Sequence, residues 1–520
     1  MRTTINTIFK TPKKTLCLLL ALLFLMPSGT AQDENSLTLG IISVTSQYMN
    51  PLVPVEREFR SLQSLVYESL VTIDDDYLPQ PNLAERWESN EDCSTWYFYL
   101  RDGITFHDGT PLTARDVVNT VKTILSIKDS TENPGAYASL QYFVKNITAS
   151  DKRTVVISTN RQNIAFPYAM TFPVLPSSQV QAENPVGTGP YFVEKFNPKE
   201  FVILSANQSW WRGIPKVDTV MATFHTTNRD LMTSFEYNRV DAILTRSLNA
   251  AQYRGGTSFI NLAVRTHQLE TLQMNNTVRE LNDVRVRKAI RYAINVDELL
   301  SLAYLDMAQR ADTPMLPGTW TYSDMPELFQ FNPEKAKALL DEAGWVDSNG
   351  DGTRDKIIDG KNANLVLRFL VYEEQDNSVR TLAANKISSM LHAVGITCNI
   401  SLVSYETAKA RLKARNYDLC LAAFNMDPVP DPGFLLMSRN TCNYTAYASK
   451  EMDNLFSELR STTKQENYRN ILFQIQSLFA EDCPFVCLYY RRGAILSRTL
   501  FTKVRDLREP EALKGIAEGL

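Results

Sequence analysis

Strand and helix signals alternate along almost the whole chain, with no internal repeat and no low-complexity linker. The clearest example lies between residues 365 and 425, where apolar strand-like runs at 365–371, 396–402 and 417–424 alternate with helical stretches at 378–394 and 405–414. Parallel strands need a long crossover connection, which is usually a helix. This segment therefore predicts a parallel β-sheet unit, and the whole chain is expected to be a mixed α/β protein.

Apolar periodicity predicts further helices, among them those at 60–70, 114–126, 283–300 and 332–343. Thr113 precedes the second of these with an acidic residue three positions later, which is a capping-box pattern. Asn332 precedes the fourth helix, and Gly344 follows it as a terminator. Local chemistry alone therefore marks the ends of these two helices.

The size and charge of the chain exclude several classes of protein. With 520 residues and 44% hydrophobic residues, it can bury large cores without disulfides or metals, and two to four folding units are expected. The net charge of −4 argues against a nucleic-acid partner, which needs a basic surface. The four histidines, at 107, 225, 267 and 392, never reach metal-ligand spacing, so a histidine metal site is not expected.

The first 31 residues have the three parts of a secretory signal peptide. Four basic residues precede an apolar run at 16–26, and small residues then lead to a cleavage site after Ala31. An apolar run of eleven residues is too short for a membrane span, which needs about 20. Cys17 is preceded by Lys14 and followed by most of the apolar run, the reverse of a lipobox, so lipidation is not expected. The protein is expected to be exported to the periplasm or another extracytoplasmic space.

Cleavage would remove four basic residues and no acidic one, which changes the net charge from −4 to −8. No later stretch reaches 18 consecutive apolar residues. The remaining cysteines allow many disulfide pairings, among which the sequence does not choose. They stand at positions 93, 398, 420, 442, 483 and 487.

Motifs of common enzymes are missing from the sequence. There is no G-x-S-x-G, H-E-x-x-H, P-loop or G-x-G-x-x-G motif. Ser461 and Lys464 match S-x-x-K by letters, but the partner motifs of that enzyme class are absent. No catalytic residue and no cofactor are therefore expected.

One loop partly matches a calcium site. Oxygen ligands at Asp347, Asn349 and Asp351 have the spacing of the first half of a calcium loop, and Asp355 stands at its ninth position. The twelfth position, where a bidentate Glu belongs, is Ile358. A solvated Asn/Gly/Asp turn is the favoured interpretation, with bound calcium as the alternative.

Six segments together resemble one family, the solute-binding proteins of peptide-type ABC importers (family 5, the oligopeptide- and dipeptide-binding proteins). They follow the family order from about residue 37 to the C-terminus, and although each alone is weak, their combination is specific. The segments are LVYESLVTIDDDYLPQPNLAERW (65–87), WYFYLRDGITFHDGTPLTARD (96–116), GTGPYFVEKF (187–196), NQSWWRGIPKVDTV (207–220), DVRVRKAIRYAINVDELL (283–300) and FNPEKAKALLDEAGW (331–345).

The resemblance implies a bilobed α/β fold of the periplasmic-binding-protein type, class II or cluster C, with an extra subdomain inserted in lobe I. Ligand would be enclosed between the lobes by hinge closure. The expected parts are the signal peptide at 1–31, lobe I at 32–75, 180–270 and 487–520, the inserted subdomain at 76–179, and lobe II at 271–486.

The resemblance also indicates a ligand site in residues 417–435. Peptide binders of the family carry an aromatic residue followed by an Asp that pairs with the peptide α-ammonium, and these positions fall on Phe424 and Asp427. Asp431 falls on a later acidic position of the family pattern, but this sequence has one more residue between Asp427 and Asp431 than the pattern has. An enclosed ammonium needs a carboxylate, because closure removes its water. The sequence departs from the pattern in having Phe where the family has Trp.

Other candidate contacts lie after strands. Tyr48 and Met49 follow the first predicted strand, and Tyr372 follows the strand at 365–371; aromatic residues there would stack on peptide side chains. Arg380 is expected to be a helix residue with a structural partner.

The expected function is capture of a small peptide and its delivery to a membrane permease, by a monomer. A non-peptide solute (nickel chelate, haem, opine or sugar) on the same fold remains an alternative. So does an exported peptide sensor or chaperone that is not coupled to transport.

Overall fold

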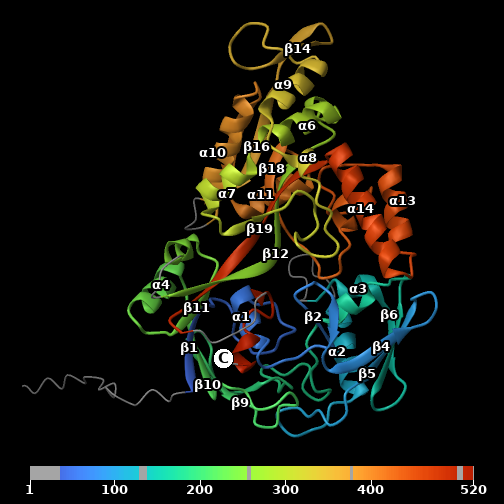
Figure 1. Cartoon of the computed structure of the whole chain (residues 1–520), viewed down its shortest axis with the longest axis vertical. Helices are drawn as coiled ribbons and strands as arrows, with labels where there is room; N and C mark the ends of the chain where they lie inside the picture. The colour runs from blue at the N-terminus through green and yellow to red at the C-terminus, as the bar shows by residue number, and fades with distance from the viewer. Residues whose placement is uncertain (1–34, 128–136, 255–258, 375–378, 500–506, 519–520) are drawn as a thin grey trace, which may run out of the picture.

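The computed structural model describes residues 35–127, 137–254, 259–374, 379–499 and 507–518 (Figure 1). The predicted signal peptide at 1–31 lies outside the described residues. None of the described helices combines the length and the apolar character that a membrane span needs.

One large mixed sheet runs through the whole molecule, in the order β17-β16-β18-β12-β19-β11-β1-β10-β9-β8, with β13 and β20 pairing to β19 and β12. We call the end formed by β1 and β8–β11 the lower lobe and the end formed by β16–β18 the upper lobe (Figure 1). The strands are β1 Ser36–Ile42, β8 Tyr191–Asn197, β9 Phe201–Ala206, β10 Thr219–His225, β11 Ala242–Thr245, β12 Ile260–Met274, β13 Ala308–Arg310, β16 Val366–Tyr372, β17 Thr397–Val403, β18 Leu419–Asn425, β19 Phe485–Ser497 and β20 Leu507–Arg508.

Two long antiparallel strands, β12 and β19, connect the lobes. Their lower parts pair from Ile260 to Arg265, and their upper parts pair from Leu269 to Gln273. The register shifts between Arg265 and Leu269, as expected where a β-bulge bends a ladder. The lobes therefore meet at an irregular point in a continuous pair of strands.

The parallel unit predicted at 365–425 is confirmed. Strand β16 pairs in parallel with β17 over seven residues and with β18 at Phe369 and Leu370. The crossover helices are α10, Val379–His392, and α11, Tyr405–Lys413. Antiparallel pairing of β18 with β12 joins this unit to the crossing strands.

A separate four-stranded antiparallel sheet lies beside the lower lobe, in the order β4-β5-β7-β6, and we call it the side sheet (Figure 1). Its strands are β4 Ala84–Ser89, β5 Thr95–Leu100, β6 Val144–Ala149 and β7 Thr154–Thr159. Helix α2, Ala114–Ser126, packs on it and begins with the predicted capping box of Thr113 and Asp116. The side sheet falls within 76–179, although the boundaries of the predicted inserted subdomain stay a prediction.

Two predicted helices differ from the structure because of long-range or capping contacts. The stretch at 60–70 is helical only in α1, Arg57–Gln63, because the carbonyls of Leu65 and Val66 accept hydrogen bonds from the distant segment 189–191. A Cβ atom on Gly189 would lie 2.6 Å from the Leu65 carbonyl, so only glycine permits this approach.

The stretch predicted as one helix at 283–300 consists of two helices, α6 Val284–Ala293 and α7 Val296–Tyr304. Asn295 interrupts the helical pattern, because its side chain caps α7 by accepting from the Glu298 amide. The helix predicted at 332–343 is confirmed as α9, Pro333–Glu342, with Asn332 as its cap.

The remaining elements are short strands and the helices that cover the sheets. They are β2 Val71–Ile73, β3 Pro79–Pro81, β14 Asp355–Ile358, β15 Lys361–Asn364, α3 Leu140–Phe143, α4 Asn228–Glu236, α5 Arg279–Asn282, α8 Pro326–Phe329, α12 Gly433–Leu436, α13 Lys450–Leu459, α14 Gln465–Asp482, α15 Gly515–Glu518, and the 3-10 helices Phe166–Met170 and Leu248–Tyr253.

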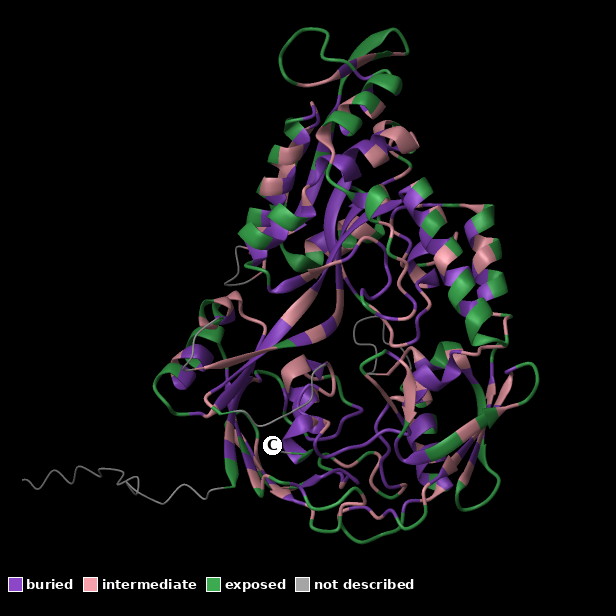
Figure 2. Cartoon of the chain, viewed as in Figure 1, coloured by how far each residue is buried: buried purple, intermediate pink, exposed green. Residues whose placement is uncertain are grey.

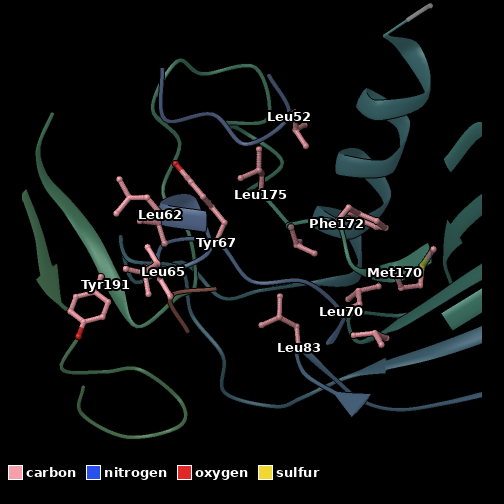
Figure 3. Close-up of a cluster of buried hydrophobic side chains, with 14 of the residues drawn as sticks. Leu52, Leu62, Leu65, Tyr67, Leu70, Leu83, Met170, Phe172, Leu175 and Tyr191 are labelled. Carbon is pink, nitrogen blue, oxygen red and sulfur yellow. The ribbon is translucent and has the colours of Figure 1, made fainter. Parts of the chain in front are cut away.

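Buried residues line the strands that run through both lobes (Figure 2). In the lower core, residues far apart in the sequence pack together, such as Leu62, Met170 and Tyr191 (Figure 3). Another cluster joins Tyr77 and Tyr168 to upper-lobe residues such as Leu472. The two ends of the molecule therefore make apolar contact beside the crossing strands.

Candidate functional site

A small pocket lies where segments of both lobes meet, between the crossing strands and the loop after β18. It brings together side chains from five distant parts of the chain. Its lining consists of Tyr77, His267, Pro314, Met315, Leu316, Thr321, Met426, Asp427, Val429, Pro430, Asp431, Pro432 and Tyr490. Two predicted ligand residues, Asp427 and Asp431, therefore share one pocket.

Asp427 lies two residues after the end of β18 and is half-buried. Its Oδ1 accepts a hydrogen bond from the Val429 amide at 2.9 Å. Burial raises the pKa of Asp427 above its ordinary value, and the charge of Asp431 raises it further, although hydrogen bonds from Ser139 and Val429 oppose the shift. The ionised carboxylate is thus short of favourable partners, and a cation beside it would stabilise it.

Asp431 is in a different position, because a partner already neutralises it. The guanidinium of Arg460 donates to both carboxylate oxygens, at 2.7 and 3.0 Å. The Gly433 amide donates to Oδ1 at 2.9 Å. Asp431 is therefore ion-paired within the upper lobe and does not need a ligand for charge balance.

Phe424 and Met49 lie in cores instead of lining this pocket. Phe424 is 8% exposed and packs against Tyr444 and Phe434, with ring centroids 6.2 and 6.5 Å away. Met49 is fully buried in the lower core. Their predicted ligand contacts remain untested.

Tyr48 is 38% exposed, in the loop that follows β1. Glu56, which the sequence did not single out, holds this loop by accepting hydrogen bonds from the Val44 and Thr45 amides at 2.9 and 2.6 Å. Although burial raises the pKa of Glu56, hydrogen bonds from Ser46 and Thr45 outweigh it and lower the pKa to about 2. The charged carboxylate thus fixes the loop that carries Tyr48.

Tyr372 stands at the end of β16, next to a buried ionic network. The Arg380 guanidinium lies 4.0 Å from the centre of the Tyr372 ring, and Tyr405 packs edge-on at 5.3 Å. Arg380 is on α10 and bonds Glu270 of β12 at 2.8 Å, which provides the structural partner expected for it. Tyr372 therefore packs on this network in the described structure.

Tyr77 is a site residue that the sequence reasoning missed. Its hydroxyl donates to the Pro428 carbonyl at 3.0 Å, next to Asp427. Its own carbonyl accepts from the Tyr168 hydroxyl at 2.7 Å and from Trp320 Nε1 at 3.1 Å. It also has a backbone φ of 64°, which is uncommon for a bulky residue and persists only where surrounding contacts determine it.

Tyr77 lies in the motif at 65–87, but no local signal separates it from an ordinary turn residue. Only its contacts with Tyr168 and Pro428, which are 91 and 351 positions away, identify it. Through them Tyr77 joins the turn between β2 and β3 to the upper lobe.

Removal of the Tyr77 hydroxyl tests this connection. Tyr77→Phe is expected to lower the free energy of unfolding by about 1–2 kcal/mol, since the Pro428 carbonyl loses its buried donor. Chemical denaturation would measure the change. Tyr142→Phe is the matched control, because Tyr142 is 70% exposed, and an equal effect in both variants would contradict the role of Tyr77.

The hinge side of the pocket is electropositive. Burial and the nearby Arg508 and Arg57 lower the pKa of His267 to about 3, so this imidazole is neutral at physiological pH. Arg508 also lies 4.8 Å from the Tyr77 ring centre. A ligand cation is therefore favoured at Asp427 and disfavoured toward His267.

In the loop at 347–355, the acidic side chains are used by the loop itself. Asp347 accepts from the Gly350 and Gly352 amides, and Asp351 accepts from the Thr353 amide. Asp355 is buried and accepts from Ser348. No group of three potential metal-binding His, Cys, Asp or Glu side chains occurs among the described residues. These hydrogen bonds favour the turn interpretation over the calcium alternative.

The six cysteines after the predicted cleavage site all lie in the described residues and are free thiols there. Burial raises the pKa of both Cys398 and Cys420 to about 12, so these thiols are protonated and unreactive at neutral pH.

The sequence model of the bacterial extracellular solute-binding proteins, family 5 (Middle), matches residues 79–446. The chain is 25% identical over 489 residues to the oligopeptide-binding protein AppA of Bacillus subtilis (strain 168), which covers 89% of this chain and 87% of AppA. It is 24% identical over 443 residues to the nickel-binding periplasmic protein of Escherichia coli (strain K12), which covers 79% of this chain and 82% of that protein.

Solved structures show the same fold. The ABC transporter substrate-binding protein CtaP of Listeria monocytogenes has a TM-score of 0.78 at 21% identity, over 93% of this chain and 98% of CtaP. AppA in complex with a nonapeptide has a TM-score of 0.67 at 22% identity, over 92% of this chain and 98% of AppA. The predicted bilobed α/β fold is thereby confirmed. The family model matches well over half of this chain, so the chain belongs to the family-5 bacterial extracellular solute-binding proteins.

Proposed function

We propose that this protein encloses a small peptide between its lobes and delivers it to the membrane permease of an ABC importer. Membership of a transport family of binding proteins supports this role, and so does the likeness to AppA, an oligopeptide-binding protein whose solved structure holds a nonapeptide. The protein would be exported with its signal peptide removed near Ala31, without lipidation, and would act as a monomer with no catalytic residue.

The closure that we propose is a hinge motion at the bulge between Arg265 and Leu269 of β12. In this proposal lobe I comprises 32–75, 180–270 and 487–520, with the inserted subdomain at 76–179 and lobe II at 271–486. Ligand binding would favour the closed form because ligand contacts both lobes only there.

The observation that carries the proposal is the half-buried carboxylate of Asp427, which lines the pocket between the lobes. Its raised pKa reflects lost hydration, and its pocket has apolar walls such as Met315 and Val429. The α-ammonium of a peptide would restore the lost electrostatic stabilisation through a charge-assisted hydrogen bond. The neighbouring Asp431 is already paired with Arg460, so Asp427 is the better candidate.

Asp427→Asn is expected to weaken the binding of a tripeptide by about 10- to 100-fold in calorimetry, because a hydrogen bond between charged groups is lost. N-acetylation of the peptide should cost the wild-type protein a similar factor and the variant almost nothing. Asp351→Asn is the control, because Asp351 lies in an exposed loop and does not line the pocket. An unchanged affinity of Asp427→Asn for the free-amine peptide would disprove the ammonium assignment.

The relation to a nickel-binding protein leaves a non-peptide solute as the alternative. Native mass spectrometry of the purified protein separates the two, since co-purified peptides support the proposal and a metal chelate, haem, opine or sugar would overturn it.

A further inference from the structure

A second pocket lies where the segment after the side sheet meets the upper lobe. Arg161 and Gln162, which follow β7, face the end of α13 across a space of about 320 Å³. The upper-lobe side is formed by Met437, Ser457, Arg460 and Ser461. Figure 1 shows α13 above the side sheet and to the right of the crossing strands.

A single ion pair lies between this pocket and the Asp427 pocket. Asp431 lines the first pocket, and its partner Arg460 lines the second. A peptide held at Asp427 that extended past the Asp431–Arg460 pair would next meet the second pocket, since an extended chain advances by about 3.3–3.6 Å per residue. The two pockets can therefore hold successive parts of one ligand.

The two arginines of the second pocket have more N–H donors than the neighbouring side chains accept. Arg460 donates two hydrogen bonds to Asp431 and one to the Met437 sulfur, although a guanidinium carries five N–H donors. Arg161 is exposed and forms no ion pair with any described residue. Since Asp431 already balances Arg460, Arg161 leaves the pocket with an excess positive charge.

The serine hydroxyls of the pocket use their protons within the same helical segment, and Asp92 lies in solvent. The Ser457 and Ser461 hydroxyls donate to the helix carbonyls of Asp453 and Glu458. Asp92, which Gln162 contacts, is fully exposed and accepts hydrogen bonds from Ser94. Its charge is screened by solvent, so it offsets the guanidinium groups only weakly.

We propose that this second pocket is an anion-selective ligand subsite, in which Arg161 and Arg460 receive a carboxylate of the bound peptide. The carboxylate is either an acidic side chain or the C-terminus of a short ligand. This proposal rests on the proposed peptide-binding function, and it adds a preference that the Asp427 contact does not supply.

Calorimetry with a set of matched tetrapeptides tests the subsite. The baseline is Ala-Ala-Ala-Ala amide, with Glu or Gln placed at positions 2, 3 and 4, and with a free C-terminal acid in a separate arm. We expect one Glu peptide, or the free acid, to bind about 5- to 20-fold more tightly than its Gln or amide counterpart. The Glu–Gln pairs and the acid–amide pair distinguish the two sources of the carboxylate.

Arg161→Gln should remove that preference, so that each Glu peptide binds as tightly as its Gln counterpart and the free acid as tightly as the amide. Arg153→Gln is the matched control, because Arg153 is also exposed near the side sheet but pairs with Asp102 outside the pocket, and it should keep the preference. Baseline binding without any Glu–Gln or acid–amide difference would overturn the subsite alone, as would a preference that survives in Arg161→Gln. Failure of every peptide to bind would overturn the proposed function together with the subsite.

Discussion

Arg380→Met is expected to lower the free energy of unfolding by about 3–5 kcal/mol, because it breaks a buried ion pair at the centre of an ionic network. Arg380 and Glu270 are each 1% exposed, and their side chains meet at 2.8 Å. Methionine fills a similar volume but leaves the buried charge of Glu270 with one partner fewer. Chemical denaturation monitored by circular dichroism would measure the loss.

The network explains why so large an effect is expected at this position. Arg491 of β19 contacts Glu270 at 3.1 Å and Glu374 at 2.8 Å, and Glu374 also contacts Arg380. Two guanidinium groups and two carboxylates thus join both crossing strands to α10. Loss of one member leaves the other three with an unbalanced charge in a region of low dielectric.

Two further variants make this prediction decisive. Arg153→Met, in a pair that is 51% and 88% exposed, should cost less than about 1 kcal/mol. Glu270→Gln combined with Arg380→Met should recover part of the loss, because the two residues are in contact and the stranded charge is removed. If Arg380→Met costs no more than Arg153→Met, the network does not stabilise the fold.

The second large effect is expected at Glu68, a carboxyl group that is 8% exposed in the lower lobe. Burial raises its pKa to about 7, although the indole groups of Trp211 and Trp210 and the charge of Arg212 oppose the shift. Trp211 Nε1 donates to both carboxylate oxygens at 3.1–3.2 Å, and Trp210 Nε1 donates at 3.3 Å. The folded protein therefore holds a proton here that the unfolded chain releases near its ordinary value of 4.5.

The sign of the pH dependence follows from this difference. A pKa that is raised on folding contributes stability below pH 4.5, and this contribution is lost as the pH rises through 7. The loss at Glu68 is about 3 kcal/mol, from the difference between the two pKa values. Glu68→Gln cannot ionise, so the free energy of unfolding of the wild type should fall relative to that of the variant by about that amount as the pH rises from 5 to 8.

Denaturation curves at pH 5, 6, 7 and 8 would measure the gap between wild type and variant. Glu88→Gln is the control, because the Glu88 side chain is 56% exposed, and its gap to wild type should stay within about 0.5 kcal/mol over the same range. A gap for Glu68→Gln that stays constant with pH would show that Glu68 is ionised throughout.

Helices and strands whose ends are determined by neighbouring residues agree with the prediction from sequence. Helix α2 begins after Thr113 and α9 after Asn332, because their caps are built from residues three positions apart. The parallel unit of β16, β17 and β18 follows from apolar runs separated by helices of sufficient length. Elements set by distant residues differ, as in α1, whose expected last turns instead bond to the segment 189–191.

The candidate site also contains residues that the sequence predicted and residues that only tertiary contacts identify. Asp427 was reached through the family resemblance and lies in a pocket between the lobes, whereas Phe424 and Met49 lie in cores. Tyr77 and Glu270 carry no local signal, because Pro428 and Arg380, which they bond, lie 351 and 110 residues away. Arg161 carries none either, because the pocket that it lines is completed by the upper lobe.

By itself, the amino-acid sequence determined the α/β class, the capped helices and the family, because these depend on local periodicity and on motifs whose order is preserved. Only the tertiary structure decided which charges are paired. It placed Arg460 on Asp431, left Asp427 without such a partner among the described residues, and buried Arg380 with Glu270. The physical reason is that the energy of a charge depends on its burial and on its nearest partners, which the folded chain brings together from distant segments.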